Sequence, residues 1–260
     1  MTNIIAIVQA RMSSTRLPGK VLKPLGSKMT IQYVFDQLKG SKLLTQSLLA
    51  TSTDHSDDPI AAWAKRAKVE CERGSLMDVL DRYYQAAKAH HADAVVRITA
   101  DCPLIDAEVV DKVIERFLKG DCDYCSNVNP PTFPDGLDTE VMSFNALERA
   151  WKEASHPVER EHVTIYMRNY PRQFRIVNVT SPIDYSKLRW TLDTQQDYEF
   201  LNRVIQKLEL SHIRDHNPRF SMNDVLELLK QDNSLLEINH DIPRNEGYFS
   251  SLQHDYMPRL

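Results

Sequence analysis

Short apolar runs recur along the first two-thirds of the chain, separated by longer amphipathic stretches. Four runs of four or five residues each predict strands, most of them buried. The predicted strands are residues 4–8, 48–51, 69–72 and 95–99. Strands that alternate with helices are typical of βα units around a mostly parallel sheet.

The intervening stretches carry apolar residues at helical spacing and begin with capping residues. Thr30 and Asp106 are each expected to cap a helix, and Asp58 followed by Pro59 is expected to start another. A further helix is expected over residues 76–87. The pattern therefore predicts an α/β fold with a mostly parallel sheet.

The regular alternation loosens beyond the helix that Asp106 starts. Strands are expected at residues 137–142, 174–179 and 189–192, with helices beginning near Ser143 and Pro157. Two later helices are expected, one over residues 198–208 and one that begins at a capping box of Ser221 and Asp224. We interpret residues 1–210 as the main domain and residues 211–260 as a helical and irregular extension packed on it.

Composition and charge argue against several classes of protein. The 260 residues are 42% hydrophobic with a net charge of −4, which does not favour nucleic acid or an anionic membrane surface as a partner. No apolar run approaches the roughly 20 residues that a membrane helix needs. The N-terminus also lacks the basic segment and cleavage site of a signal peptide. We expect a cytoplasmic protein with no nucleic-acid or membrane partner.

The four cysteines are too few to form a disulfide framework in a chain of this size. Cys122 and Cys125 have the C-x-x-C spacing that also occurs in zinc knuckles and redox pairs. A knuckle needs a second ligand pair, which does not follow, and a redox pair needs a strand-to-helix turn. Buried or incidental thiols are the favoured interpretation.

Positive charge is concentrated at the start of the chain. The first 35 residues contain five Lys or Arg and no Asp or Glu. Arg11, Arg16 and Lys20 follow the first predicted strand, where ligands bind in open α/β sheets. Cations, hydroxyls and backbone N–H groups together suit a phosphate chain, so these side chains should face a solvated cleft. The loop is neither a dinucleotide fingerprint nor a P-loop, and a solvated surface loop is the alternative.

Residues 11–20 read Arg-x-x-Ser-x-Arg-Leu-Pro-Gly-Lys, which resembles the signature loop of cytidylyltransferases that activate acidic sugars, such as the 3-deoxy-manno-octulosonate enzyme. The chain as a whole resembles still more the spore-coat polysaccharide biosynthesis protein F group of that superfamily. The matching segments cover nearly the full length. They are residues 73–75 with 78–82, 99–105, 136–141, 160–164, 189–194 with Asp197, and 244–248.

This resemblance implies a nucleotide-diphospho-sugar transferase fold, a Rossmann-like three-layer arrangement with a mostly parallel sheet. Residues 1–210 would form the nucleotidyltransferase domain. The implied reaction transfers a cytidylyl group from CTP to an acidic or otherwise anionic sugar and releases pyrophosphate, for surface polysaccharide or glycan biosynthesis. CTP and the sugar are the implied partners, Mg²⁺ is the implied cofactor, and a homodimer is an assembly consistent with the sequence.

The same resemblance assigns residues to the sites of the enzyme. Catalysis is assigned to Arg11, Lys20 and Asp101, and metal binding is assigned to Asp101 and Asp193. Nucleotide binding is assigned, in chain order, to Ala10, Arg11, Ser13, Ser14, Arg16, Lys20, Thr53, Arg73, Gly74, Ser75 and Arg82. Acceptor binding is assigned to Asp135, Asp138, Glu140, Arg160 and His162.

The metal site has a physical argument of its own. Asp101 directly follows a buried strand, and Mg²⁺ prefers one or two carboxylates together with phosphate oxygens and water. Asp193 ends the late strand, but Asp193 or Thr194 suits equally well the N-cap of the following helix. Some relatives carry a D-x-D pair here, whereas this chain has Thr-Leu-Asp at residues 191–193. Asp193 would therefore act alone, and one-metal and two-metal mechanisms stay open.

Three other functions are alternatives. A glycosyltransferase on the same fold would consume a nucleotide sugar, generally with a D-x-D motif, but the triplet at residues 121–123 precedes its strand. A cytidylyltransferase that acts on a small phosphonate is not distinguished by the sequence. A non-catalytic nucleotide-binding protein is disfavoured by the presence of Arg11, Lys20 and both carboxylates.

Overall fold

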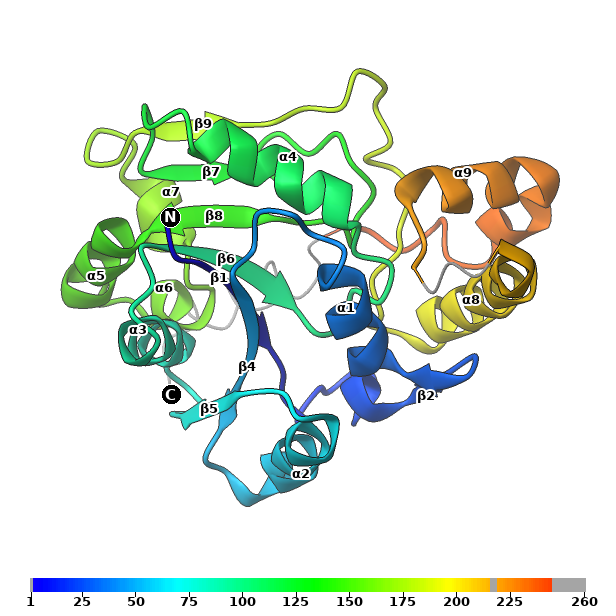
Figure 1. Cartoon of the computed structure of the whole chain (residues 1–260), viewed down its shortest axis with the longest axis horizontal. Helices are drawn as coiled ribbons and strands as arrows, with labels where there is room; N and C mark the ends of the chain where they lie inside the picture. Colours follow the sequence, from blue (N-terminus) through cyan, green and yellow to red (C-terminus); the bar gives the residue numbers. More distant parts are fainter. Residues whose placement is uncertain (1, 216–218, 245–260) are drawn as a thin grey trace, which may run out of the picture.

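A seven-stranded sheet forms the centre of the protein (Figure 1). The computed structural model describes residues 2–215 and 219–244. The strands of the sheet are β1 (Ile4–Gln9), β4 (Gln46–Ser52), β5 (Cys71–Gly74), β6 (Ala94–Thr99), β7 (Tyr124–Ser126), β8 (Glu140–Ser143) and β9 (Ile176–Asn178). Their order across the sheet is β5, β4, β1, β6, β8, β7 and β9. Only β8 runs antiparallel to its neighbours, so the prediction of a mostly parallel sheet is confirmed.

Helices cover both faces of this sheet (Figure 1). Alternate residues of β1 point to opposite faces, which gives the strand two apolar surfaces to bury. One face packs against α1 (Thr30–Leu38), α2 (Asp58–Ala67) and α4 (Ala107–Phe117). The other packs against α3 (Val79–Ala89), α5 (Phe144–Glu153) and α7 (Ile165–Asn169), and α6 (Pro157–Glu161) contacts α3 and α7. This arrangement confirms the predicted three-layer α/β fold.

A third apolar cluster joins the last helices to the beginning of the chain. It is built from α8 (Gln195–Asp215), α9 (Met222–Gln231) and the 3-10 helix η3 (Asn233–Glu237). These pack beside the small hairpin of β2 (Pro24–Leu25) and β3 (Lys28–Met29), and Leu25 and Trp190 are fully buried in the same cluster. Position 210 falls within α8, and the division into two parts stays a prediction.

Several helix starts follow the local sequence as expected. The Asp106 carboxylate accepts hydrogen bonds from the backbone N–H groups of Glu108 and Val109 at the start of α4. The Ser143 hydroxyl caps α5, and the capping box at Ser221 starts α9. These predictions are confirmed because a cap depends only on residues within three or four positions of it.

Other boundaries were predicted wrongly. The Thr30 hydroxyl donates to the Lys23 carbonyl instead of capping, so Met29 is the N-cap of α1. Asp57, not Asp58, is the residue before α2. The third strand lies at residues 71–74, where it pairs with β4, and the strand expected at 137–142 begins only at Glu140.

The strand expected at residues 189–192 is absent from the described structure. This segment makes a single bridge, between Arg189 and Asp135. Its alternating apolar residues Trp190 and Leu192 are buried in the cluster around α8 and not within the sheet. An alternating pattern records burial on one side, and here that burial comes from helices.

The four cysteines are free thiols. Cys122 and Cys125 are buried, and burial raises the pKa of Cys125 to about 12. A buried thiol with a raised pKa is a poor nucleophile, which agrees with the expected structural role. In the part of the chain that the structure describes, no helix is both long and apolar enough to cross a membrane.

Candidate active site

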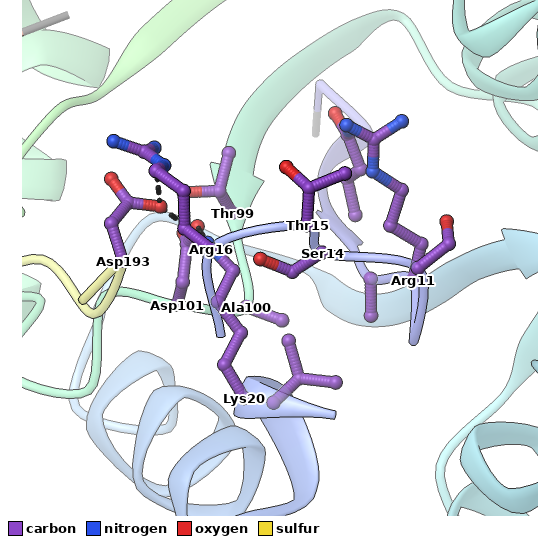
Figure 2. A pocket seen from close by; sticks show the side chains of 13 residues that line it. Arg11, Ser14, Thr15, Arg16, Lys20, Thr99, Ala100, Asp101 and Asp193 are labelled. Carbon is purple, nitrogen blue, oxygen red and sulfur yellow. Dashed lines mark hydrogen bonds and ion pairs between the residues drawn. The ribbon is translucent and has the colours of Figure 1, made fainter. Parts of the chain in front are cut away.

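A pocket of about 420 Å³ opens where β1 and β6 end. Gln9 and Ala10 reach it from the end of β1, and residues 99–101 reach it from the end of β6. The loop that follows β1 supplies most of the remaining wall (Figure 2). The complete lining is Gln9, Ala10, Arg11, Ser13, Ser14, Thr15, Arg16, Lys20, Val21, Thr99, Ala100, Asp101 and Asp193.

Local hydrogen bonds shape the loop between β1 and the 3-10 helix η1 (Lys20–Leu22). The Met12 carbonyl accepts from the backbone N–H groups of Ser14 and Gly19, which closes the loop on itself. Gly19 has a φ of 68°, a left-handed conformation that glycine adopts at no steric cost. Leu17 is buried among the apolar residues around α8, so it anchors the loop while its polar neighbours line the pocket.

Lys20 lies between the two predicted metal carboxylates. Its Nζ is 2.5 Å from Asp101 Oδ2 and 2.7 Å from Asp193 Oδ1. Arg16 Nη2 is 3.0 Å from the same Asp193 oxygen (Figure 2). Lys20 lines the pocket, in agreement with the expectation that it faces a cleft, but its side chain is only 12% exposed. Its two ion pairs withdraw it from solvent.

The charges of this cluster reinforce one another. Burial raises the pKa of Asp101, but the adjacent Lys20 ammonium outweighs burial and lowers this pKa to about 2. Burial lowers the pKa of Lys20, but Asp101 and Asp193 outweigh it and raise this pKa above its ordinary value. Asp101 and Lys20 therefore stay charged at neutral pH.

Thr194, and not Asp193, caps the helix α8. The Thr194 hydroxyl accepts from the backbone N–H of Asp197, and the Asp197 carboxylate accepts from that of Thr194. This reciprocal pair caps α8. The Asp193 carboxylate instead contacts Lys20 and Arg16 through Oδ1 and Arg189 through Oδ2. Of the two alternatives for Asp193, the cap is excluded by this geometry.

Arg11 lies across the pocket from this cluster (Figure 2). Its side chain is 42% exposed and its Nη2 is 3.6 Å from Glu161 Oε1, a loose contact. It can therefore turn toward a ligand at little cost. The pocket thus brings together the whole predicted set from the first loop with both metal carboxylates: Ala10, Arg11, Ser13, Ser14, Arg16, Lys20, Asp101 and Asp193.

Four other predicted nucleotide residues, Thr53, Arg73, Gly74 and Ser75, lie at the ends of β4 and β5, and the fifth, Arg82, lies in α3; none of them lines this pocket. The Thr53 backbone N–H donates to the Gly74 carbonyl, and the Ser75 hydroxyl accepts from the Asp78 backbone N–H. Arg73 donates to the Ser52 carbonyl and pairs with Asp58. Their role in nucleotide binding stays a prediction.

Arg82 differs from these residues because it is buried without a hydrogen-bond partner. None of its three side-chain nitrogens has a partner among the described residues, and its residue is 3% exposed. Burial lowers its pKa. A buried guanidinium of this kind is usually satisfied by water or a ligand. The Arg82 assignment to nucleotide binding is compatible with this observation and stays a prediction.

The five predicted acceptor residues do not line the pocket and bind other parts of the chain. Asp135 pairs with Arg189, Asp138 with Arg244, and Glu140 with Arg97. Burial raises the pKa of Asp138 to about 7 against the pull of Arg244. The Arg160 guanidinium pairs with Asp78 at 2.5 Å, and burial lowers the pKa of His162. Their role in acceptor binding stays a prediction.

Sequence reasoning gave no role to Arg189 or Asp197. Arg189 contacts Asp135, Asp193 and Asp197 and is 6% exposed. The sequence did contain a signal for these roles: residues 189, 193 and 197 are charged and evenly spaced in a segment whose other residues are uncharged. Charges in such a run are buried only when they pair, so they mark an internal ion cluster.

The two carboxylates fit a magnesium site that would take its remaining ligands from a nucleotide and water. The described residues hold no group of three or more His, Cys, Asp or Glu side chains that could bind a metal by themselves. A single ammonium nevertheless contacts both Asp101 and Asp193, so the two carboxylates lie close enough to share one cation. Mg²⁺ commonly uses one or two carboxylates and takes its remaining ligands from phosphates and water.

The fold and this pocket define the class of the protein as a nucleotidyltransferase. An open α/β sheet presents a cationic loop and paired carboxylates at the carboxyl ends of its strands, where phosphates bind. Residues 5–242 match the model of the cytidylyltransferase family, and the chain belongs to that family. The family resemblance and the enzyme class expected from the sequence are confirmed.

Individual relatives agree with this assignment. The spore coat polysaccharide biosynthesis protein SpsF of Bacillus subtilis is 32% identical over 239 residues, which are 89% of this chain and 96% of that protein. The structure of a cytidylyltransferase from Leptospira borgpetersenii superposes with a TM-score of 0.84 at 33% identity, covering 90% of this chain and 97% of that one. A 3-deoxy-manno-octulosonate cytidylyltransferase of Solibacter usitatus is 34% identical over 113 residues, 43% of each chain.

Proposed function

We propose that this enzyme transfers the cytidylyl group of CTP to an anionic sugar and releases pyrophosphate. The observation that carries the proposal is the contact of Lys20 with both Asp101 and Asp193, in a pocket lined by the cationic loop. An acidic sugar is supported by the relative named for 3-deoxy-manno-octulosonate. A role in surface polysaccharide synthesis is supported by the relative named for spore coat polysaccharide.

The reaction needs positioning and charge stabilisation more than covalent chemistry. A hydroxyl of the sugar attacks the α-phosphorus of CTP in line, and pyrophosphate leaves. Arg11, Arg16 and Lys20 stabilise the negative charge of the triphosphate and of the departing pyrophosphate. Ser13 and Ser14 line the same wall and offer hydroxyl and backbone donors.

Asp101 and Asp193 are the residues that would hold Mg²⁺. Bound there, the ion supplies charge neutralisation to the phosphate oxygens. The lysine that bridges the two carboxylates keeps them close together, and its ammonium can pair with phosphate oxygens when a triphosphate binds. The expected cytoplasmic location and a homodimeric assembly belong to the same proposal.

The glycosyltransferase alternative loses support from the position of its motif. Asp121 and Asp123 precede β7. Because β8 is antiparallel to both β6 and β7, β7 runs in the same direction as β6. The start of β7 therefore lies at the opposite end of the strands from the pocket, which is at the end of β6. Asp121 pairs with Arg116, and Asp123 pairs with Arg175. A non-catalytic role is disfavoured by the close contact of Lys20 with both carboxylates. A small phosphonate as acceptor is tested together with sugars below.

Pyrophosphate release measures the proposed activity. Each of the four nucleoside triphosphates should be combined with a panel of acidic sugars, neutral sugars and small phosphonates in the presence of Mg²⁺. We expect release only with CTP and an anionic acceptor. Asp123→Asn, at the opposite edge of the sheet, should behave as wild type, whereas Asp101→Asn should not. Turnover of a UDP-sugar in preference to CTP would favour the glycosyltransferase instead.

A further inference from the structure

The Arg189 side chain uses all five of its N–H donors inside the protein. Nε donates to Asp197 Oδ1 at 2.9 Å, and Nη2 donates to Asp197 Oδ2 and Asp193 Oδ2, both at 3.0 Å. Nη1 donates to Asp135 Oδ2 at 2.9 Å and to the Pro243 carbonyl at 3.5 Å. The planar fork of a guanidinium fixes the directions of these five donors together.

This arrangement orients the Asp193 carboxylate. Its Oδ2 is held by Arg189, whose side chain is 5% exposed, whereas its Oδ1 faces Lys20 and Arg16 in the pocket. A carboxylate with one oxygen pinned presents the other in a fixed direction. The backbone adds to this, because the Leu192 N–H donates to the Asp101 carbonyl at 2.8 Å and ties the two carboxylate-bearing segments together.

The segment after α9 holds the same arginine from outside. Asn239 is buried, and its Nδ2 donates to the Arg189 carbonyl at 3.1 Å and to Asp197 Oδ1 at 3.0 Å. Together with the Pro243 carbonyl, this gives the segment of residues 239–243 three contacts with the Arg189–Asp197 pair. The segment does not line the pocket, and these contacts reach Asp193 through Arg189 and Asp197.

We infer that Arg189 is the positioning residue that presents Asp193 Oδ1 to the metal and phosphates, and that Asn239 holds Arg189 in place for this task. The inference rests on the proposed function, because it requires Asp193 to bind a metal. Residues that orient a metal ligand commonly change metal affinity or activity 10–100-fold when they are replaced. It also explains how Asp193 can act without a paired D-x-D, since the orientation comes from Arg189 instead of a second carboxylate.

Binding of Mn²⁺ tests this inference independently of turnover. The full-length protein is saturated with CTP, without acceptor, and free Mn²⁺ is followed by its EPR signal against a CTP-only background. Arg189→Lys keeps the charge but offers three donors without the planar fork, and we expect its Mn²⁺ affinity to fall about 10–100-fold. Asn239→Ala removes two hydrogen bonds at the back of the network, and we expect a fall of about fivefold.

Matched control variants separate positioning from general damage. Arg175→Lys makes the same change in an exposed Arg–Asp pair directly before β9. His240→Ala alters the exposed neighbour of Asn239, whose ring has a hydrogen bond with the Glu237 carbonyl. Both should bind Mn²⁺ as wild type does. Asn239→Ala is expected to fold even if Arg189→Lys does not, so at least one informative variant is available.

The outcomes distinguish the inference from the function on which it rests. If Asp193→Asn weakens Mn²⁺ binding but Asn239→Ala and any folded Arg189→Lys bind it as wild type does, the inference is overturned and the proposed function stands. Lower melting temperatures with unchanged Mn²⁺ affinity would likewise show a structural role alone. If Asp193→Asn leaves Mn²⁺ binding unchanged, the metal role of Asp193 fails, and the inference fails with it.

Discussion

Replacing Lys20 by Met should destabilise the protein as well as inactivate it. Methionine keeps the apolar stem in its buried position and removes the ammonium that joins Asp101 to Asp193. From the sequence, Lys20 was expected to face a solvated cleft, and its loss was expected to leave folding nearly untouched. The structure changes the expectation for folding, because the side chain is 12% exposed and contacts two carboxylates.

The lowered pKa of Asp101 gives the expected size of the loss in stability. The pKa of Asp101 is about 2, against an ordinary value of 3.8. At about 1.4 kcal/mol per pKa unit, this difference corresponds to about 2–3 kcal/mol of stability at neutral pH. Removing Lys20 also removes the cost of burying its own charge, which offsets part of the loss. We therefore expect the free energy of unfolding to fall by about 2 kcal/mol.

Urea denaturation at a series of pH values measures this loss. Because the folded pKa of Asp101 lies below its unfolded value, the stabilisation is fully present above about pH 4 and is lost as the pH falls toward 2. The difference in the free energy of unfolding between wild type and Lys20→Met should become smaller as the pH falls from about 4 toward 2. Turnover should also fall, by an amount that corresponds to a loss of about 2–4 kcal/mol of transition-state stabilisation, the usual scale for one preorganised charge.

Lys28→Met is the matched control. Lys28 pairs with Asp36 at 2.9 Å outside the pocket, with its side chain 33% exposed, so its loss should cost less than about 1 kcal/mol. If Lys20→Met and Lys28→Met have the same free energy of unfolding at neutral pH, the reasoning is refuted, because Lys20 would then not be the counter-ion of the two carboxylates. An unchanged turnover would refute its placement against the triphosphate.

Three further predictions concern the metal carboxylates, the nucleotide and the backbone. Asp101→Asn and Asp193→Asn should each cut turnover by orders of magnitude and raise the Mg²⁺ requirement, and the double variant should be little worse than either, as steady-state kinetics over a Mg²⁺ series can show. CTP with Mg²⁺ should raise the melting temperature more than CMP does; equal shifts in a thermal melt would mean that the loop does not bind the β and γ phosphates. Gly136→Ala should lower the free energy of unfolding, measured by urea denaturation, by about 2–3 kcal/mol. The reason is that Gly136 has a φ of +109° and an added Cβ would lie 2.7 Å from the Trp190 carbonyl. A variant as stable as wild type would show that the backbone relaxes there.

Local signals in the sequence determined much of the fold. Capping residues such as Asp106 and Ser221 act on backbone groups a few positions away, so they mark helix starts without reference to the rest of the chain. The apolar run of β1 and the cationic loop after it are also adjacent in sequence. Parallel strands end at a common edge, and this geometry predicted that Asp101 would meet the loop. Motif resemblance then identified the family.

The surroundings of Asp193 were decided only by tertiary structure. The apolar run before Asp193 does not distinguish an aspartate that caps a helix from one that Arg189 turns toward a pocket, because either can directly follow such a run. The deciding contact comes from Arg189, which Asp197 holds from eight positions away and which long-range packing brings to residues 135 and 239.

The partners of the predicted acceptor residues, and the absence of the late strand from the described structure, could not be predicted for a related reason. Charged side chains and alternating apolar residues show that a segment is partly buried, but they do not show what buries it. Residues 189–192 are covered by helices that begin after residue 194, and Asp138 is paired with Arg244, more than one hundred positions later. The sequence determined which groups must be paired or covered, and the tertiary structure decided their partners, because pairing energy depends on distance in space and not on separation along the chain.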